Sequence, residues 1–432
     1  MKVKGHGAQA PRVAGDASLA TEGKHKKHDK HAKAETPVVE SASPSATPLT
    51  GQAATPQAPA AGASPSLGFV VEEKDGKHDL LPPVKTLLHK YEQKDEAKRS
   101  YERVLTVLAK VDSFIGTETD PNKLVDNMLT NDLRRTVFLL QGQMRLYGDL
   151  IGPQGKDLEA KAKALEDALG NTLLYQGLMK TAEEKGASPK VKAYFAGQLD
   201  LTRKALTDLV AAHWTPDPAK GGQIDAVDDF LKVMSDVDWP GYNKDAEYLA
   251  DQIRAHVETT SEKSFDMTDM ANGIHALRRA LRWTHLFYEA AGGLVQLDAN
   301  KNPVPEFTAL LDAEVAKSKF MTLPDPAREK DPVKLSKSIY VANLDAMLKL
   351  GALKDRGEPV DHFAEAMLAV GEAKDVADSR TKAAAFLGAA ETADGVVHAE
   401  ARAIYDGIKQ SGLFEAQMDE LEAVSKARAK DH

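Results

Sequence analysis

The sequence contains no cysteine among its 432 residues. Disulfide bonds, thiolate metal sites and catalysis by a thiol are therefore excluded. No run of 18 or more apolar residues occurs, so the sequence predicts no membrane-spanning helix. The first residues, Met1 to Gly7, lack the apolar segment that a secretory signal needs, and we therefore expect a cytoplasmic protein.

Outside the first residues of the chain, basic residues are outnumbered by acidic ones. The sequence has 56 Lys and Arg against 65 Asp and Glu, a net charge of −9. Residues 1–33 carry a balance of +5, which leaves −14 for the rest. Because proteins that bind nucleic acid usually have a basic domain, this balance argues against a nucleic-acid partner. Another polyanion would bind only if the basic residues gather on one face.

Residues 1–80 have the composition of a disordered tail. Lys24 to Lys33 is basic and rich in histidine, and Thr36 to Ser66 is rich in Ala, Pro, Ser and Thr. Such segments bury too little apolar surface to offset the entropy of the chain. His25, His28 and His31 could chelate a divalent metal weakly, but a solvated polar tail is the favoured interpretation.

The rest of the chain has helical spacing and no strand pattern of convincing length. We expect an all-α fold, a duplicated antiparallel helical bundle of two four-helix-like halves after the disordered tail. Residues 81–222 would form the first half, 223–371 the second and 372–432 a set of C-terminal helices, with helix breakers from Trp214 to Gly222 at the boundary. The spacing predicts helices over 82–115, 121–151, 156–185, 189–213, 224–234, 243–260, 267–291, 306–320, 333–354 and 359–371.

One predicted helix, Met267 to Ala291, carries an unusual basic stripe. On a helical projection the apolar side holds Ile274, Leu277, Leu281, Thr284 and Tyr288, and the adjacent side holds His275, Arg278, Arg279 and Arg282. Like charges on one helical face repel each other by a few tenths of a kcal/mol per pair. Either acidic side chains from neighbouring helices or a polyanionic ligand must offset this repulsion.

A weaker copy of the stripe lies roughly 144 residues upstream, between Met128 and Leu150. When the two copies are aligned with Asn131 at the position of His275, their Arg-Arg pairs align, and Phe138 stands at the position of Arg282. The basic residues of this copy are Arg134, Arg135 and, further along, Arg145. A repeat of this length indicates a duplicated bundle rather than a solenoid, whose periods are about 20–50 residues.

The run from His275 to Arg282, His-Ala-Leu-Arg-Arg-Ala-Leu-Arg, resembles the signature helix of the CHAD family, the conserved histidine α-helical domain. Leu165 to Leu174 and Leu350 to Asp355 resemble the family's following helix, which carries a Leu-Gly-x-x-Arg-Asp pattern. The resemblance covers roughly residues 80–370. It implies a duplicated helical fold that binds inorganic polyphosphate through a basic surface and has no catalytic activity.

Two functional hypotheses follow. In the first, a non-enzymatic module binds polyphosphate or a similar polyanion, and the binding residues are His275, Arg278, Arg279, Arg282, Arg134, Arg135 and Arg145. Arginine suits this ligand because its planar fork donates two or more charged hydrogen bonds. His275 would add a donor whose charge responds to pH near neutrality. In the second, a helical scaffold keeps the CHAD-like fold without the ligand and reaches a protein partner through its tail.

The divergence of the first copy, at Asn131 and Phe138, favours the scaffold, whereas the intact second copy favours the ligand. In the scaffold, the arginines would pair with acidic residues of the same chain such as Glu166, Asp167, Asp345 or Asp355.

Catalytic and metal motifs are not expected. Gly152 to Asp157 lacks the first glycine, the hydroxyl and the preceding strand of a phosphate-binding loop. Thr392 to Glu400 resembles a turn of small helical modules but does not supply the oxygen ligands of a calcium loop. We therefore expect no enzyme activity, no cofactor and no metal.

Overall fold

The structure, a computed structural model, describes residues 99–429 apart from 117, 221, 223, 235, 327, 328, 330 and 390–393. The chain divides into two units, 1–41 and 42–432, and every described residue belongs to the second unit. The predicted tail, its histidines and the first two residues of the turn from Thr392 to Glu400 therefore lie outside the described residues, as does the first part of the helix predicted over 82–115.

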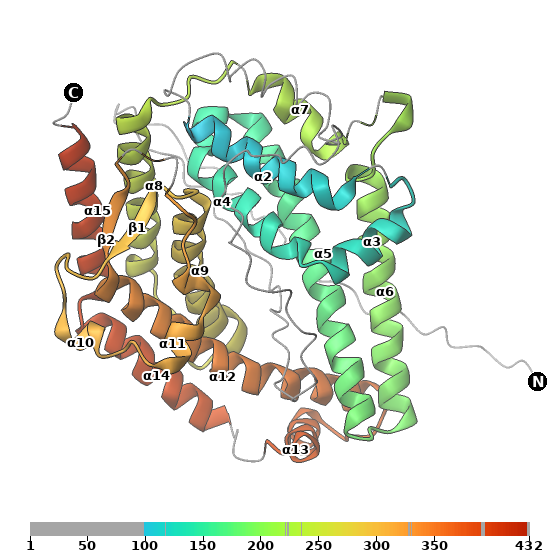
Figure 1. Ribbon diagram of the computed structural model, residues 1–432. Helices are drawn as coiled ribbons and strands as arrows, with labels where there is room; N and C mark the ends of the chain where they lie inside the picture. Colours follow the sequence, from blue (N-terminus) through green and yellow to red (C-terminus); the bar gives the residue numbers. More distant parts are fainter. Residues whose placement is uncertain are drawn as a thin grey trace, which may run out of the picture. The chain divides into compact units, whose positions relative to one another are not determined.

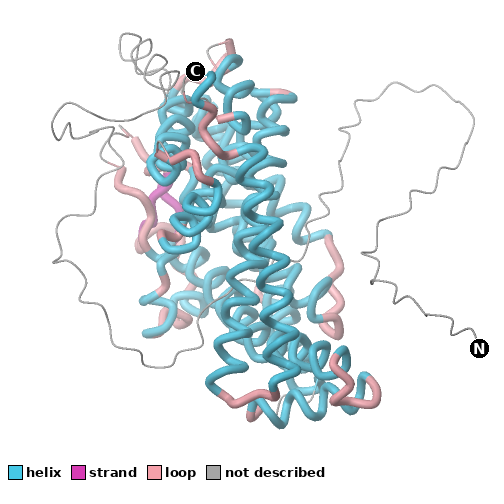
Figure 2. The backbone as a smooth tube through the Cα atoms, turned by 90° about the vertical axis from the view of Figure 1, so that its right-hand side faces the viewer, coloured by secondary structure: helices cyan, strands magenta, loops and turns pink. Residues whose placement is uncertain are grey.

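The prediction of an all-α fold is confirmed, since helices make up most of the described chain (Figure 2). The described part of residues 81–222 contains the helices α2 (Arg99–Ile115), α3 (Pro121–Thr130), α4 (Leu133–Ile151), α5 (Pro153–Glu184) and α6 (Pro189–His213). The side chains of Asp120 and Ser188 cap α3 and α6 through the amides of Asn122 and Val191. A proline follows each cap, as the sequence predicted for these helix starts.

One boundary in this half differs from the prediction. The helix expected over 121–151 is two helices, because Asp132 adopts a left-handed conformation with φ 52° between α3 and α4. An aspartate tolerates this conformation better than most residues. The long helices α5 and α6 pack side by side, and α4 packs against α5 (Figure 1).

The second half is more irregular. After η2 (Pro218–Lys220) in the boundary segment, its elements are α7 (Asp225–Val233), α8 (Tyr242–Glu262), η3 (Met270–Ile274), α9 (His275–Ala290), β1 (Val295–Asp298), α10 (Pro305–Thr308), α11 (Ala313–Lys317), η4 (Lys319–Met321), β2 (Val333–Ser336) and α12 (Lys337–Ala369). The C-terminal helices are α13 (Val376–Leu387), α14 (Asp394–Gln410) and α15 (Leu413–Ala429). In Figure 1, α12 runs beneath α9 and toward the ends of α5 and α6.

Three expectations for the second half are wrong. The helix predicted over 306–320 is broken into α10 and α11, because Asp312 caps a new start through the amides of Glu314 and Val315. Residues 333–336 form a strand that pairs in parallel with β1, from Val295 with Val333 to Asp298 with Ser336. The two helices predicted over 333–354 and 359–371 are one helix that contains Pro359. Burial of Leu353 and Phe363 on either side holds α12 continuous through the proline.

Two apolar cores hold these helices. The main core joins α2, α4, α8, α9 and α12 with α14 and α15, and includes Trp214, Trp239 and Trp283. A smaller core lies at the far ends of α5, α6, α12 and α13, where the ring of Phe363 packs 4.9 Å from Phe195 and 5.2 Å from Phe386. The helix α9, which carries the basic stripe, therefore lies inside the main core.

Candidate functional site

A π-helical turn at Met270–Ile274 precedes the basic stripe and sets its orientation. Asp269 caps the turn by accepting hydrogen bonds from the amides of Ala271 and Asn272, each at 2.9 Å. Gly273 lies so close to the preceding loop that a Cβ atom would stand 1.6 Å from the carbonyl oxygen of Asp266. Single π-helical turns are rare in proteins, and those that occur are often found at functional sites. This one fixes the rotation of α9, and so the direction in which His275 points.

Both faces of α9 are buried. The apolar side is as predicted, because Ile274, Leu277 and Leu281 have no exposed surface. The basic side is not open to solvent either: His275 is 4% exposed, and Arg279 and Arg282 are 7% exposed. Arg278 is half-buried. The stripe is therefore an internal cluster of cations rather than a surface patch.

Cations from three further elements join the stripe. Arg282 and Arg134 lie over the ring of Phe138, with their guanidinium carbons 4.4 and 5.4 Å from its centre. Lys319 is near enough to Arg135 and Arg282 for their charges to lower its pKa. We define the cation cluster as His275, Arg278, Arg279 and Arg282 of α9, Arg134 and Arg135 of α4, Lys319 of η4 and Lys354 of α12.

Burial is the main cause of the lowered pKa values in this cluster. Burial first, and then the charges of Arg279 and Lys354, lower the pKa of His275 to about 2. The imidazole is therefore neutral, and the expectation that its charge responds to pH near neutrality is wrong. Burial also lowers the pKa of Arg278, and the charges of Arg134 and Arg279 act in the same direction. Burial likewise lowers the pKa of Lys319.

Carboxylates offset part of this charge. Arg134 donates from Nε and Nη2 to Oε1 of Glu166, at 2.8 and 2.5 Å. Arg135 donates to Glu289 at 2.6 Å.

On α12, Lys354 lies 3.0 Å from Asp355 and 2.9 Å from Glu358, and both carboxylates raise the pKa of Arg278.

Of the acidic partners predicted from the sequence, some lie at the cluster and others form ion pairs along their own helices. Glu166 and Asp355 lie at the cluster. Asp167 pairs with Lys163 at 2.5 Å, and Asp345 pairs with Lys349 at 2.7 Å, each one turn along its own helix.

The structure places Arg145 apart from the cluster. Its guanidinium carbon lies 3.9 Å from the ring centre of Trp283, and its Nε donates to Glu159 at 2.7 Å. Phe138 and Trp283 contact each other edge to face at 5.9 Å. Arg145 of α4 therefore packs on the ring of Trp283 of α9, whereas Arg134 and Arg282 lie over Phe138.

Sequence reasoning missed two members of the cluster. Lys354 was named only as part of the Leu-Gly-x-x-Lys-Asp pattern, although it is completely buried. Lys319 lies in a segment predicted to be the end of a long helix. Its position depends on the break at Asp312, so no periodicity in the sequence could have placed it beside α4.

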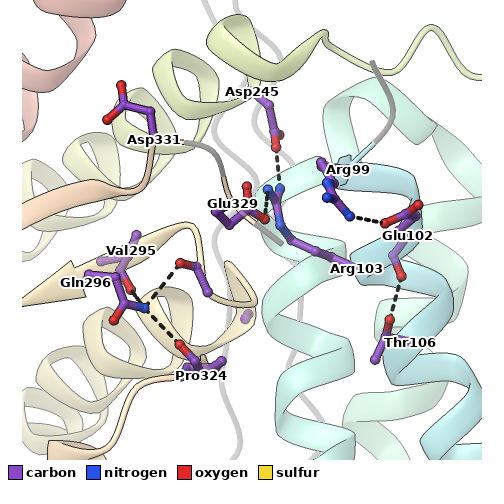
Figure 3. A network of polar contacts seen from close by, with 12 residues as sticks. Arg99, Glu102, Arg103, Thr106, Asp245, Val295, Gln296, Pro324, Glu329 and Asp331 are labelled. Carbon is purple, nitrogen blue, oxygen red and sulfur yellow. Dashed lines mark hydrogen bonds and ion pairs between the residues drawn. The ribbon is translucent and has the colours of Figure 1, made fainter. Parts of the chain in front are cut away.

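A second ionic network ties α2 to α8 (Figure 3). Arg103 donates to Asp245, to Glu329 at 2.9 Å and to the hydroxyl of Tyr147 at 3.3 Å. Tyr147 in turn donates to Asp245 at 2.9 Å. The side chains of Arg103, Asp245 and Glu329 are 6%, 1% and 3% exposed. Because two carboxylates here surround one guanidinium, this network offers no surplus positive charge and is structural.

The comparisons with known proteins add no relatives. No protein-family model matches the chain, and neither a curated protein nor a solved structure matches it. Over the described residues, no helix combines the length and apolar character that a membrane crossing requires. The same part of the chain holds no group of three or more metal-ligating side chains.

Proposed function

We propose that this protein is a non-enzymatic module that binds a polyanion, with inorganic polyphosphate as the ligand, at the cation cluster. The observation that carries the proposal is geometric: His275, Arg279 and Arg282 of α9 are buried, and the guanidinium groups of Arg282 and Arg134 both lie over the ring of Phe138. Burial is the largest cause of the lowered pKa of His275 and of Arg278, and neighbouring cations add to it, although Asp355 and Glu358 oppose the shift of Arg278. A site where cations lower one another's pKa gains stability from an anion, because the anion removes their mutual repulsion.

The chemistry of the cluster suits a chain of phosphates. Each phosphate of the chain carries one negative charge and presents several acceptor oxygens. Guanidinium groups donate to such oxygens in pairs, and these charged hydrogen bonds are about twice as strong as neutral ones. Nε2 of His275 is buried and has no hydrogen-bond partner among the described residues. A neutral imidazole there would complete its hydrogen bonding by donating to a phosphate oxygen.

The resemblance of His275 to Arg282 to the CHAD signature supports the same ligand. It also supports a duplicated arrangement, in which α4 with α5 corresponds to α9 with α12. A cytoplasmic location belongs to this proposal.

The alternative is a helical scaffold, and one observation favours it. Arg134 and Arg135 of the first copy each form an ion pair with a carboxylate of a neighbouring helix, Glu166 in α5 and Glu289 in α9. If every cation of the cluster were offset in this way, the bundle would keep its fold without a ligand and would act through a protein partner.

A binding experiment separates the two functions. Full-length protein is titrated with long-chain polyphosphate at low and high salt, beside the double variant R278Q/R282Q. The matched control is R254Q/R380Q, which removes the same charge from partly exposed arginines of α8 and α13. We expect salt-sensitive binding by the wild type and the control, and a loss of at least about tenfold in R278Q/R282Q.

Absence of binding by the wild type at low salt would overturn the polyanion proposal. Equal losses in both double variants would show a diffuse charge effect rather than a site. Circular dichroism of each variant establishes that it is folded. If R278Q/R282Q alone fails to fold, these arginines are structural, and the scaffold becomes the better account.

A further inference from the structure

Gly351 lies where Arg278 crosses α12. A Cβ atom built on Gly351 would stand 2.9 Å from Nε of Arg278, 3.6 Å from Nη2 and 3.7 Å from Cζ. The guanidinium therefore lies directly against the backbone of the helix. Glycine in the interior of a long helix reduces its stability. At position 351 it also leaves the room that the close approach of Arg278 requires.

The same contact occurs a second time in the bundle. A Cβ atom on Gly170, in the interior of α5, would stand 2.7 Å from Nη2 of Arg134 and 3.0 Å from Cζ. Arg134 and Arg278 occupy matching positions in the two basic stripes, and each glycine follows a buried leucine, Leu169 or Leu350. Two independent helix pairs thus bring an arginine onto a glycine of the neighbouring helix.

The carboxylates on α5 and α12 are arranged differently around the two arginine–glycine contacts. On α5, Glu166 lies one turn before Gly170 and binds Arg134 directly. On α12, Asp355 and Glu358 lie one and two turns after Gly351 and are shared with Lys354. The carboxylates of the second half therefore act on two cations, Lys354 and Arg278, whereas Glu166 binds Arg134 directly.

We propose that Gly351 is a positioning residue for the polyanion site, because it lets Arg278 lie flat against α12 with its donors directed into the cation cluster. This inference rests on the proposed function. A side chain at position 351 would displace the guanidinium and leave the helix intact, since the atoms it meets belong to the end of a flexible side chain.

The test compares G351A with G177A in the full-length protein. Gly177 lies inside α5 with no atom within 4 Å of its Cβ position, so it reports the general effect of alanine in a long helix. We expect G351A to weaken binding of long-chain polyphosphate by roughly tenfold and to reduce the slope of log K against log salt by about one phosphate contact. G177A should bind like the wild type.

A double-mutant cycle with R278A supplies a readout that needs no ligand. In the R278A background, G351A should raise the thermal midpoint as G177A does and should not weaken binding further. In the wild-type background, G351A should leave the thermal midpoint unchanged or lower it.

Three results would overturn the inference: unchanged affinity in G351A, an equal loss of affinity in both backgrounds, or an equal gain of midpoint in both backgrounds. If the wild type itself does not bind polyphosphate, the proposed function fails. The midpoint cycle still decides whether Gly351 positions Arg278.

Discussion

At the scale of single residues, burial decides the protonation of His275. The ring is 4% exposed and lies beside several cations, so protonation would place a further charge where no solvent can stabilise it. Its pKa falls from an ordinary value of 6.5 to about 2. The imidazole thus enters any binding event as a neutral donor.

This shift predicts a loss of stability in acid. The unfolded chain takes up a proton on this histidine below pH 6.5, whereas the folded chain does so only near pH 2. Stability should therefore fall as the pH falls through this window, by about 2 kcal/mol between pH 7 and pH 5 from this residue alone. Urea unfolding at both pH values should show a smaller pH dependence in H275N than in the wild type. Equal dependence in the two proteins would contradict a buried, neutral His275.

Arg103 gives a second prediction at this scale. Its removal in R103M would leave Asp245 and Glu329 buried without their cation, which should lower the free energy of unfolding by about 3–5 kcal/mol. The control is R99M, in the same helix, because Arg99 pairs with the partly exposed Glu102 and should cost less than about 1 kcal/mol. Denaturant unfolding measures both, and similar values for the two variants would refute the network.

At the scale of elements, the π turn before α9 depends on one glycine. The variant G273A would place its Cβ atom against the backbone oxygen of Asp266, which cannot move away as a side chain can. We expect a loss of about 1–3 kcal/mol or more, as for other overpacked sites. The control G197A, in α6 with open space around its Cβ position, should be neutral or stabilising by about 0.5–1 kcal/mol. A neutral G273A would show that the turn is not constrained.

The sequence predicted elements well where a local signal marks the boundary. Capping aspartate or serine before a proline located α3 and α6, and helical spacing located α8 within two residues at each end. It failed where tertiary packing decides the outcome. Pro359 lies within a continuous helix because buried residues on both sides hold it, and four-residue strands are too short to show alternation.

The site was predicted to a similar extent. The spacing of arginines pointed to α9, which carries four members of the cation cluster, and the weaker copy pointed to Arg134 and Arg135. Burial of the stripe could not be predicted, because it depends on how α4 and α12 pack around α9. The same holds for Lys319, which the loop after α11 brings to the cluster from outside any repeat.

At the scale of the molecule, the C-terminal helices share the main core. Leu413, Leu421 and Val424 of α15 are buried in it, and α15 packs along α8 (Figure 1). L421A should therefore cost about 2–5 kcal/mol and shift the single unfolding transition reported by the three tryptophans, none of which lies in α15. The control V396A, at a half-exposed site on α14, should have little effect. A separate early transition for α14 and α15 would show that they fold independently.

We propose that the buried cations between α4, α9 and α12 bind a polyanion. The most direct measurement is the affinity of the full-length protein for long-chain polyphosphate as a function of salt concentration. We expect binding at low salt and a linear fall of log K with log salt, with a slope that reports several phosphate contacts. No binding at low salt, or an affinity that does not change with salt, would contradict it.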